Sequence, residues 1–257
     1  MSVTLSSDKV LLNVDDGVAT LILNNPEKHN VLTCAVISTF QEALAIVKSD
    51  PSVRVLVITG NGDRSFCSGA SLEELKTGEL KAEDFPELTE AVAHLPIPKI
   101  CALNGSVYGG GSELALSCDF RIGVQGMRMF VPPARIGLCY PISGIQRFVN
   151  ILGANAAKRL LIASEDFDGE GLLEIGFLTQ LCEKPDLLPT ADALAKRISG
   201  YAPLAIEAML AISDQFIHGN HDAHAAHALF QRCANSDDLK EGLASVAEKR
   251  PPVFSGR

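Results

Sequence analysis

Two glycine-containing segments carry the residues of this chain that are best suited to chemistry. The segments FCSGASL (66–72) and YGGGSE (108–113) each follow a β-rich run and each lead into a helical pattern. Small residues let another group approach the main chain closely, and a helix start offers free N–H groups at the positive end of the helix dipole. Two such segments facing each other would hold an anionic oxygen between two backbone amides.

One carboxylate and one phenol accompany these segments. Glu113 follows the glycines directly after Ser112, and Tyr140 lies in a later loop. A carboxylate can take up and release a proton, and a tyrosine hydroxyl donates a hydrogen bond because its ordinary pKa is about 10. A structural interpretation stands beside this one: the glycines as a close-packing point, Glu113 as a helix-start carboxylate and Tyr140 as a packing residue. The GGGSE spacing does not match nucleotide-binding glycine loops.

Hydrophobic patterning predicts the elements that position these segments. Two β-rich runs at 9–14 and 18–24 flank a turn-forming Asp-Gly and predict a hairpin. Thr33 is placed to cap a helix whose apolar residues follow the helical period. Further strands are predicted at 53–60, 99–104 and 119–124. The repeated strand, loop and helix succession indicates a mixed α/β fold.

The chain changes character after about residue 144, where nearly every pattern becomes helical. The consecutive segments IQRFVNILG (145–153) and NAAKRLLIA (155–163) begin this part. We therefore predict an α/β core over residues 1–195 and a C-terminal helical region over 196–257 that packs on the core or on a neighbouring subunit. No low-complexity linker separates the two parts.

Composition excludes several classes of partner. The chain has 257 residues and a formal net charge of −9, which disfavours binding to nucleic acid or to an anionic membrane. Its N-terminus lacks the features of a signal peptide, and no apolar run approaches the roughly 20 residues that span a bilayer. We therefore expect a cytoplasmic protein.

Metal and disulfide chemistry are not indicated by the sequence. The seven cysteines form an odd set without a CxxC pair, so we expect reduced, largely buried thiols. His221 and His224 are spaced by one helical turn, but they have no partner in a recognised ligand pattern, which favours a solvated helix face.

The order of these segments resembles the crotonase, or enoyl-CoA hydratase/isomerase, superfamily. The matching segments are LNNPEKHNVL (23–32), VRVLVITGNGDRSFCSGASL (53–72), ICALNGSVYGGGSELALSCDFRIG (100–123), ARIGLCYP (134–141) and EKRPPVFSGR (248–257). The resemblance implies a spiral of ββα repeats with a C-terminal helical region used in trimerisation, giving a homotrimer or a dimer of trimers. It also implies an acyl-CoA thioester as substrate, a place in fatty acid metabolism, and no cofactor beyond the coenzyme A of the substrate.

The resemblance assigns roles to individual residues. The backbone amides of Ala70 and Gly110 would form an oxyanion hole for the thioester oxygen as an enolate forms, with Glu113 and Tyr140 as the further catalytic candidates. The residues implied in substrate binding are Lys28 near the coenzyme A end, and Ser68, Ala70, Ser71, Leu72, Glu73 and Gly110 along the acyl-CoA. Residues 76–85 are expected to shape the acyl pocket.

One position departs from the hydratase pattern. The second catalytic glutamate of the family falls on Pro133, which cannot transfer a proton. Three functions therefore stay open: a lyase or isomerase that hydrates or isomerises an enoyl-CoA, a decarboxylase of a methylmalonyl-CoA-type thioester, and a non-catalytic member that binds acyl-CoA or a protein. The family's methylmalonyl-CoA decarboxylases have a tyrosine matching Tyr140, but a histidine where this chain has Ala70.

Overall fold

A seven-stranded sheet forms the centre of the molecule. The structure is a computed structural model that describes residues 1–257 apart from the side chain of His218. The strands lie in the order β1-β2-β3-β4-β6-β8-β11. Their bounds are β1 Ser2–Val3, β2 Val10–Asp15, β3 Val18–Leu23, β4 Val55–Gly60, β6 Lys99–Leu103, β8 Phe120–Val124 and β11 Gln180–Cys182. From β3 to β11 all neighbours are parallel, whereas β2 and β3 form the predicted antiparallel hairpin.

A second, four-stranded sheet carries the two glycine-containing segments. It has the order β10-β9-β7-β5, with β5 at Ser65–Cys67, β7 at Ser106–Tyr108, β9 at Arg128–Phe130 and β10 at Phe167–Asp168. The chain leaves β4, β6 and β8 of the large sheet and enters β5, β7 and β9 of the small one before each helix begins. This is a ββα succession. Sequence reasoning missed the small sheet because strands of two or three residues are too short to show a period of two.

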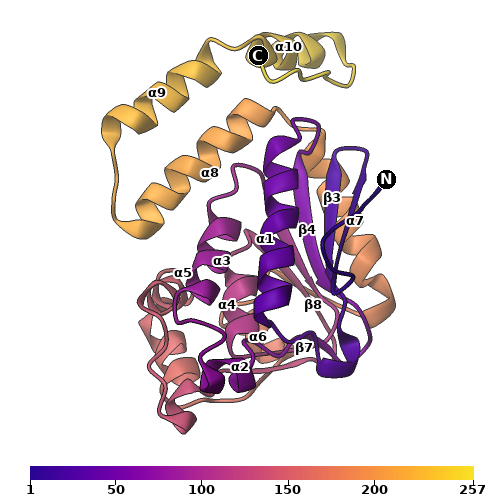
Figure 1. The fold of residues 1–257 in the computed structure, drawn as a ribbon. Helices are drawn as coiled ribbons and strands as arrows, with labels where there is room; N and C mark the ends of the chain where they lie inside the picture. The colour runs from indigo at the N-terminus through magenta and orange to yellow at the C-terminus, as the bar shows by residue number, and fades with distance from the viewer.

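Helices cover the large sheet on both sides. The helices of this part are α1 Cys34–Ser49, α2 Leu72–Thr77, α3 Asp84–Ala93, α4 Gly110–Leu116, α5 Ile142–Leu161, α6 Gly169–Glu174 and α7 Leu187–Ser199. Figure 1 shows the sheet lying between α1 and α7. Thr33 caps α1 as predicted, because its side chain accepts a hydrogen bond from the Val36 amide. Gly153 has a φ of 78° and kinks α5. The kink lies between the two consecutive segments that the sequence predicts as helices.

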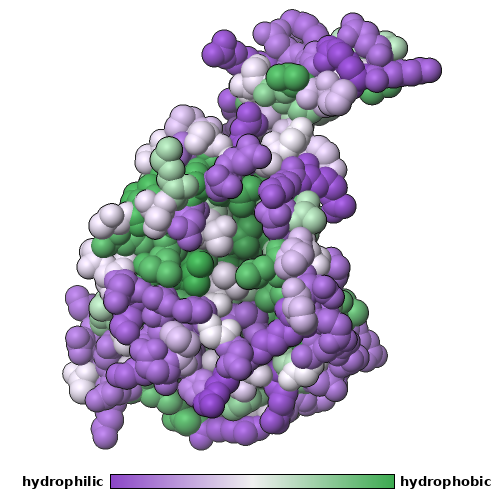
Figure 2. Space-filling model, turned by 90° about the vertical axis from the view of Figure 1, so that its right-hand side faces the viewer, coloured by the Kyte–Doolittle hydropathy of each residue, from purple (hydrophilic) through white to green (hydrophobic). Residues whose placement is uncertain are grey.

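Three C-terminal helices project from this body. They are α8 Pro203–His218, α9 Ala223–Ala234 and α10 Asp237–Glu248, and α9 packs on α8 (Figure 1). Large apolar side chains of these helices are exposed: Met209, Phe216, Phe230, Leu243 and Val246 are each 60% exposed or more. In Figure 2, green apolar surface gathers on the body below the projecting segment. The division after residue 195 and a trimerisation role for the C-terminal part stay predictions.

Neither a membrane-spanning helix nor a disulfide is found in the described part of the chain. No helix there combines the length and the apolar character that crossing a bilayer requires. All seven cysteines are free; Cys67, Cys101 and Cys118 are buried and Cys139 is exposed. Burial raises the pKa of Cys67 to about 12, so this thiol within the first glycine-containing segment stays protonated.

Candidate active site

The first glycine-containing segment is held against the start of α1. The Leu32 amide donates to the Gly69 carbonyl at 2.9 Å, and the Ser71 amide donates to the Leu32 carbonyl at 2.8 Å. The Ser71 hydroxyl then caps α2 by accepting a hydrogen bond from the Glu74 amide. Among the hydrogen bonds of the described residues, none is donated by the Ala70 amide, and Ala70 is partly exposed.

The three glycines of the second segment have different structural roles. Gly109 has a φ of 51° and a ψ of −123°, a conformation that other residues rarely adopt. A Cβ placed on Gly111 would lie 2.7 Å from the Cys67 carbonyl oxygen, so α4 packs here directly on β5. Gly110 begins α4, and its amide donates no hydrogen bond within the described part of the chain. The close-packing interpretation therefore fits Gly111, whereas Gly110 leaves an amide available.

The structure brings the two segments together. A Cβ placed on Gly69 would lie 2.8 Å from the Gly110 amide nitrogen. On its other side, Gly110 is covered by the Phe85 ring, whose Cζ atom would lie 2.9 Å from a Cβ on Gly110. Phe85 belongs to the range 76–85 that the sequence assigns to the acyl pocket. The Ala70 and Gly110 amides thus belong to neighbouring loops, with an aromatic wall beside them.

Glu113 lies at 0% exposure and is held through one oxygen only. Its Oε1 atom accepts hydrogen bonds from the Arg147 guanidinium at 2.9 Å and from the Thr89 hydroxyl at 3.1 Å. Its Oε2 atom has no hydrogen-bond partner among the described residues. Burial raises the pKa of Glu113, while the positive charge of Arg147 and the Thr89 hydroxyl oppose the rise.

Tyr140 stands next to this carboxylate. A Cβ placed on Gly144 would lie 2.5 Å from Glu113 Oε2 and 2.6 Å from Tyr140 Cε1, so both groups flank the same glycine. The Tyr140 hydroxyl donates a long hydrogen bond of 3.4 Å to the Gly109 carbonyl. Burial, and then the charge of Glu113, raise the pKa of Tyr140 well above its ordinary value. The hydroxyl therefore stays protonated and acts as a donor.

The position of the family's second glutamate is filled by a turn without carboxylates. Pro133 is buried at the start of the 3-10 helix η2 Pro133–Ile136. Arg135 in the same turn donates to the Ser164 carbonyl at 2.7 Å and lies over the Phe130 ring, which fits a structural role. Pro133 brings no proton-transferring group to Glu113, and this leaves Glu113 and Tyr140 as the titratable pair at this site.

The residues predicted to bind substrate lie on connected surface segments. Lys28 ends the 3-10 helix η1 Pro26–Lys28 and is exposed, and the carbonyl of the next residue, His29, accepts a hydrogen bond of 2.9 Å from the Ser68 amide. Leu72 is 62% exposed at the start of α2, and Glu73 is exposed beside it. Their roles as substrate contacts stay predictions.

Four residues around the carboxylate were not found from the sequence: Thr89, Glu90, Gly144 and Arg147. Thr89 shares a buried face of α3 with Phe85, Leu88 and Val92. Arg147 shares the buried face of α5 with Gly144 and Phe148. The spacing of three and four residues indicates one helix face in each case. The position of Arg147 on an otherwise apolar helix face could have been recognised from the sequence. The sequence pattern does not identify the residues with which Arg147 forms ion pairs.

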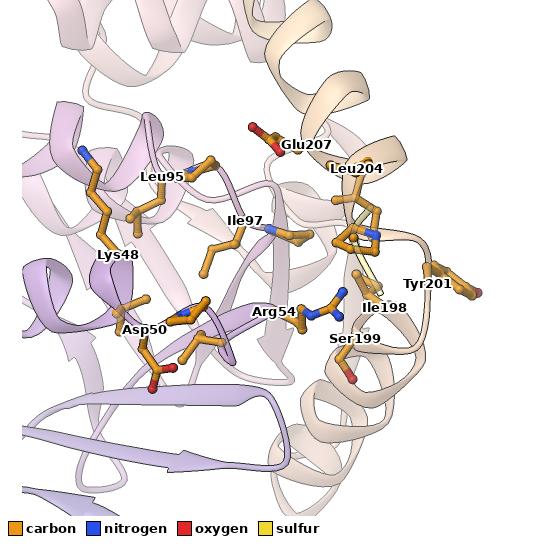
Figure 3. Close-up of a pocket in the computed structure, with 18 of the residues that line it drawn as sticks. Lys48, Asp50, Arg54, Leu95, Ile97, Ile198, Ser199, Tyr201, Leu204 and Glu207 are labelled. Carbon is orange, nitrogen blue, oxygen red and sulfur yellow. The ribbon is translucent and has the colours of Figure 1, made fainter. Parts of the chain in front are cut away.

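The pocket drawn in Figure 3 is a different feature. It has a volume of about 400 Å³ and is lined by Asp50 and Arg54, which come before β4, and by Leu95 and Ile97, which come before β6 (Figure 3). These residues lie at the amino ends of parallel strands. The loops with Ala70 and Gly110 follow β5 and β7 of the small sheet, which the chain enters after the carboxyl ends of β4 and β6. In open α/β sheets, ligands bind beyond the carboxyl ends of the strands.

The sequence places two histidines one helical turn apart, a spacing that can hold a metal ion. Among the described residues, no group of three or more His, Cys, Asp or Glu side chains could hold a metal ion. The expected helix face with two histidines needs correction: His221 precedes α9 and stacks on Phe216, whereas His224 lies within α9. Asp222 caps α9 by accepting from the amides of His224 and Ala225, and this breaks the helical spacing.

Comparison with known proteins decides the family. Residues 13–257 match the family model of enoyl-CoA hydratase/isomerase. The chain belongs to this family. The resemblance stated from the segment order is thus confirmed, and membership places the chain among proteins that act on acyl-CoA thioesters.

Individual relatives span almost the whole chain. The crotonyl-CoA hydratase of Syntrophomonas wolfei is 30% identical over 97% of this chain and 99% of its own. The short-chain-enoyl-CoA hydratase of Clostridium acetobutylicum is 28% identical over 95% and 96%. An enoyl-CoA hydratase/carnithine racemase from Magnetospirillum magneticum has a similar structure, with a TM-score of 0.91 and 27% identity over 98% of this chain and 97% of its own. The crotonase-like α/β fold is confirmed.

Proposed function

We propose that the protein stabilises the enolate of an acyl-CoA thioester and hydrates or isomerises an enoyl-CoA. The observation that carries this proposal is the Glu113 carboxylate, fully buried with Oε2 unpaired, one helical turn beyond the unpaired Gly110 amide. A buried carboxylate oxygen without a hydrogen-bond partner costs folding free energy, so its retention fits a functional role. Two of the relatives above are hydratases of crotonyl-CoA and of short-chain enoyl-CoA.

The Ala70 and Gly110 amides are the proposed oxyanion hole. Both are free of other hydrogen bonds in the described part of the chain, and Gly110 stands at the start of α4, where the helix dipole favours negative charge. Negative charge develops on the thioester oxygen as the enolate forms. Removal of one oxyanion donor costs roughly 2.7–4 kcal/mol of barrier in other enzymes.

In the proposed hydration, one carboxylate carries one proton. Glu113 Oε2 takes a proton from water while the water oxygen bonds to the β-carbon, and the electron pair of the double bond moves to the thioester oxygen as an enolate. Glu113 then returns the same proton to the α-carbon, and the enolate collapses to the 3-hydroxyacyl-CoA. In isomerisation, the same oxygen would move a proton between the α- and γ-carbons. The raised pKa of Glu113 suits both uptake and return of the proton.

The coenzyme A part of the substrate is proposed to lie over Lys28 and the segment that starts at Ser68, with Ala70, Ser71, Leu72 and Glu73 along the acyl-CoA. The exposed ammonium of Lys28 is suited to bind a phosphate. Backbone hydrogen bonds to residues 29–32 hold the segment that starts at Ser68 in place. Tyr140 lies beside Glu113, Phe85 covers Gly110, and Glu113 is fully buried in this structure, so an acyl chain reaches Oε2 only after side chains move aside. The reaction uses no cofactor beyond the coenzyme A of the substrate.

Decarboxylation of a methylmalonyl-CoA-type thioester is the second candidate. The observation in its favour is Tyr140, a protonated buried hydroxyl beside Glu113 at a site where Pro133 replaces the second glutamate. Decarboxylation needs an oxyanion hole and a proton donor for the enolate, and it needs no second carboxylate. Ala70 argues against it, because the family's decarboxylases have a histidine at this position.

The test is incubation of the purified protein with crotonyl-CoA and, separately, with methylmalonyl-CoA, followed by mass spectrometry of the thioesters. The proposed function predicts that crotonyl-CoA gains the mass of one water, and that a 3-enoyl-CoA changes its proton NMR spectrum without a change of mass. Loss of carbon dioxide from methylmalonyl-CoA alone would favour the second candidate. Retention of acyl-CoA without turnover across the panel would indicate a non-catalytic, binding member of the family.

We also propose self-association as a homotrimer or dimer of trimers through the C-terminal helices. The exposed apolar residues of α8, α9 and α10 support this, because monomers seldom expose so many large apolar side chains along three consecutive helices. A cytoplasmic location stays a proposal alongside it.

A further inference from the structure

The two oxygens of the Glu113 carboxylate have unequal surroundings. Oε1 faces the Arg147 guanidinium and the Thr89 hydroxyl, at 2.9 Å and 3.1 Å. The Thr89 hydroxyl has one proton and also lies 3.0 Å from the Pro86 carbonyl, so Arg147 is the firmer anchor. Oε2 faces Gly144, where any Cβ would lie 2.5 Å away, and it has no partner in the described structure.

Arg147 is divided between two carboxylates. Its side chain is 4% exposed, and its second terminal nitrogen donates to Glu90 Oε1 at 2.6 Å. Glu90 and Thr89 are adjacent on α3, whereas Arg147 comes from α5 and Glu113 from α4. One guanidinium therefore joins three helices around the carboxylate. The planar, fork-shaped guanidinium can hold two carboxylates at fixed directions, which a lysine ammonium cannot do.

Few other titratable groups face this cluster. The Tyr140 hydroxyl lies beside Glu113 on the loop before α5. On the outer side, the His94 ring lies 3.4 Å from Glu90 Oε2, one helical turn along α3. The Glu90 side chain is 35% exposed, so it forms the solvent-facing end of a row that runs from His94 through Glu90 and Arg147 to Glu113.

We propose that Arg147, held by Glu90, is the positioning residue that fixes Oε1 of Glu113 and leaves Oε2 as the oxygen that exchanges protons with the substrate. Glu90 is part of this arrangement because it competes with Glu113 for the single positive charge of Arg147. This inference rests on the proposed function, in which Glu113 carries the proton. Arg147 and Glu90 themselves do not touch the reacting atoms.

Two substitutions in this cluster should shift the pKa of Glu113 in opposite directions. In Glu90→Gln, Arg147 keeps its charge and loses the competing carboxylate, so the charged form of Glu113 is favoured and its pKa falls. In Arg147→Gln, the cation that faces Glu113 in the described structure is removed, so the pKa of Glu113 rises. Charge alone produces these opposite shifts, so they show that both groups act on Glu113. The positioning role is tested by Arg147→Lys, which keeps the charge and loses the fork-shaped guanidinium.

Two independent measurements follow the titration of Glu113: the pH dependence of kcat/KM and infrared spectroscopy. The acidic limb of kcat/KM for crotonyl-CoA is expected to move to lower pH in Glu90→Gln and to higher pH in Arg147→Gln. Arg147→Gln should also lose roughly 10²-fold in kcat with little change in KM, because Oε2 is misplaced. Glu87→Gln removes an exposed charge from the same helix and serves as the matched control, with an unshifted limb.

Infrared difference spectroscopy supplies the readout that needs no turnover. The band of the protonated Glu113 carboxyl is identified by its absence in Glu113→Gln. Its intensity is then followed against pH in each variant. Arg147→Lys keeps the charge and gives a second variant if Arg147→Gln fails to fold. Band shifts in opposite directions support the inference. The inference predicts that folded Arg147→Lys keeps the band near its parental pH and still loses kcat, because the charge stays and the fork-shaped geometry is lost. Full kcat in folded Arg147→Lys, or an unshifted band in folded Glu90→Gln, overturns it. Opposite shifts in a protein whose activity survives Glu113→Gln would instead overturn the proposed function alone.

Discussion

Gly69 and Gly110 cross so closely that a Cβ placed on Gly69 would lie 2.8 Å from the amide nitrogen of Gly110. Gly69 has a φ of 88°, so both its conformation and its surroundings exclude a side chain. This crossing makes neighbours of two loops that are 41 residues apart in sequence (110 − 69) and belong to different strands of the small sheet. Each loop adds one free amide, and the distance between those amides depends on this contact.

The first prediction isolates the Gly110 amide. Gly110→Pro removes the N–H group but suits the first position of a helix, whereas Gly110→Ala keeps the N–H group and adds only a Cβ against the Phe85 ring. Relative to Gly110→Ala, the proline variant should lose roughly 10²–10³-fold in kcat on crotonyl-CoA. Equal rates in the two folded variants would reject Gly110 as an oxyanion donor.

The second prediction concerns the energetic cost of Glu113. Its folded pKa lies above 4.5, so the folded state binds this proton more tightly than the unfolded state. The stability linked to this group is therefore fully present below pH 4.5 and is lost as pH rises through the folded pKa. Glu113→Gln keeps the shape of the neutral acid, so its Tm should exceed that of the parent at about pH 8 and approach it in acid.

The same substitution should remove roughly 10²–10⁴-fold of activity, the usual contribution of general acid–base catalysis. Thermal melts over a pH series and kcat on crotonyl-CoA measure the two effects. A variant that is both fully active and less stable at every pH would indicate that Glu113 is a structural carboxylate at the helix start.

The third prediction tests Phe85 as the wall of the acyl pocket. Phe85 is 7% exposed and its ring covers Gly110, so a smaller side chain opens space next to the proposed oxyanion hole. Phe85→Leu should raise kcat/KM for octenoyl-CoA relative to crotonyl-CoA by roughly tenfold or more, the range found for small changes in apolar pockets. Leu88→Met alters the same buried face without touching Gly110 and should leave the ratio unchanged.

The fold was predictable from the sequence where elements are long, whereas the roles of the site residues came from the resemblance and stay predictions. The hairpin β2–β3 and strand β4 are continuous β-rich runs, and Thr33 marks the start of α1. The strands of the small sheet are two or three residues long, so the sequence did not predict the crossing of Gly69 and Gly110, and only the resemblance implied that the Ala70 and Gly110 amides act together. Arg147 pairs with Glu113 and Glu90 across 34 and 57 residues, and helix packing, which no local pattern encodes, selects these partners.

The fourth prediction addresses self-association. Leu243 and Val246 on α10 are 66% and 78% exposed. If α10 contributes to a contact between copies of the chain, Leu243→Asp combined with Val246→Asp places two charges in that contact and should convert the oligomer to smaller species by light scattering. Lys240→Glu changes an exposed charge on the same helix and should leave the mass unchanged. A monomeric parent protein would contradict the proposal directly.

The fifth prediction separates the two candidate reactions through Tyr140. Tyr140→Phe removes only the hydroxyl, because the edge-to-face contact of the ring with Phe148 at 5.8 Å is kept. The Tyr140 hydroxyl donates to the neutral Gly109 carbonyl, and a hydrogen bond of this kind contributes about 0.5–1.5 kcal/mol, so hydration should slow by no more than roughly tenfold while Glu113 still carries the proton. A decarboxylase in which Tyr140 protonates the enolate should lose far more. Tyr108→Phe, whose ring packs on Phe130 at 5.1 Å, is the matched control. An unchanged rate in Tyr140→Phe would make Tyr140 a wall of the pocket, and Glu113 would then be the only proton carrier at this site.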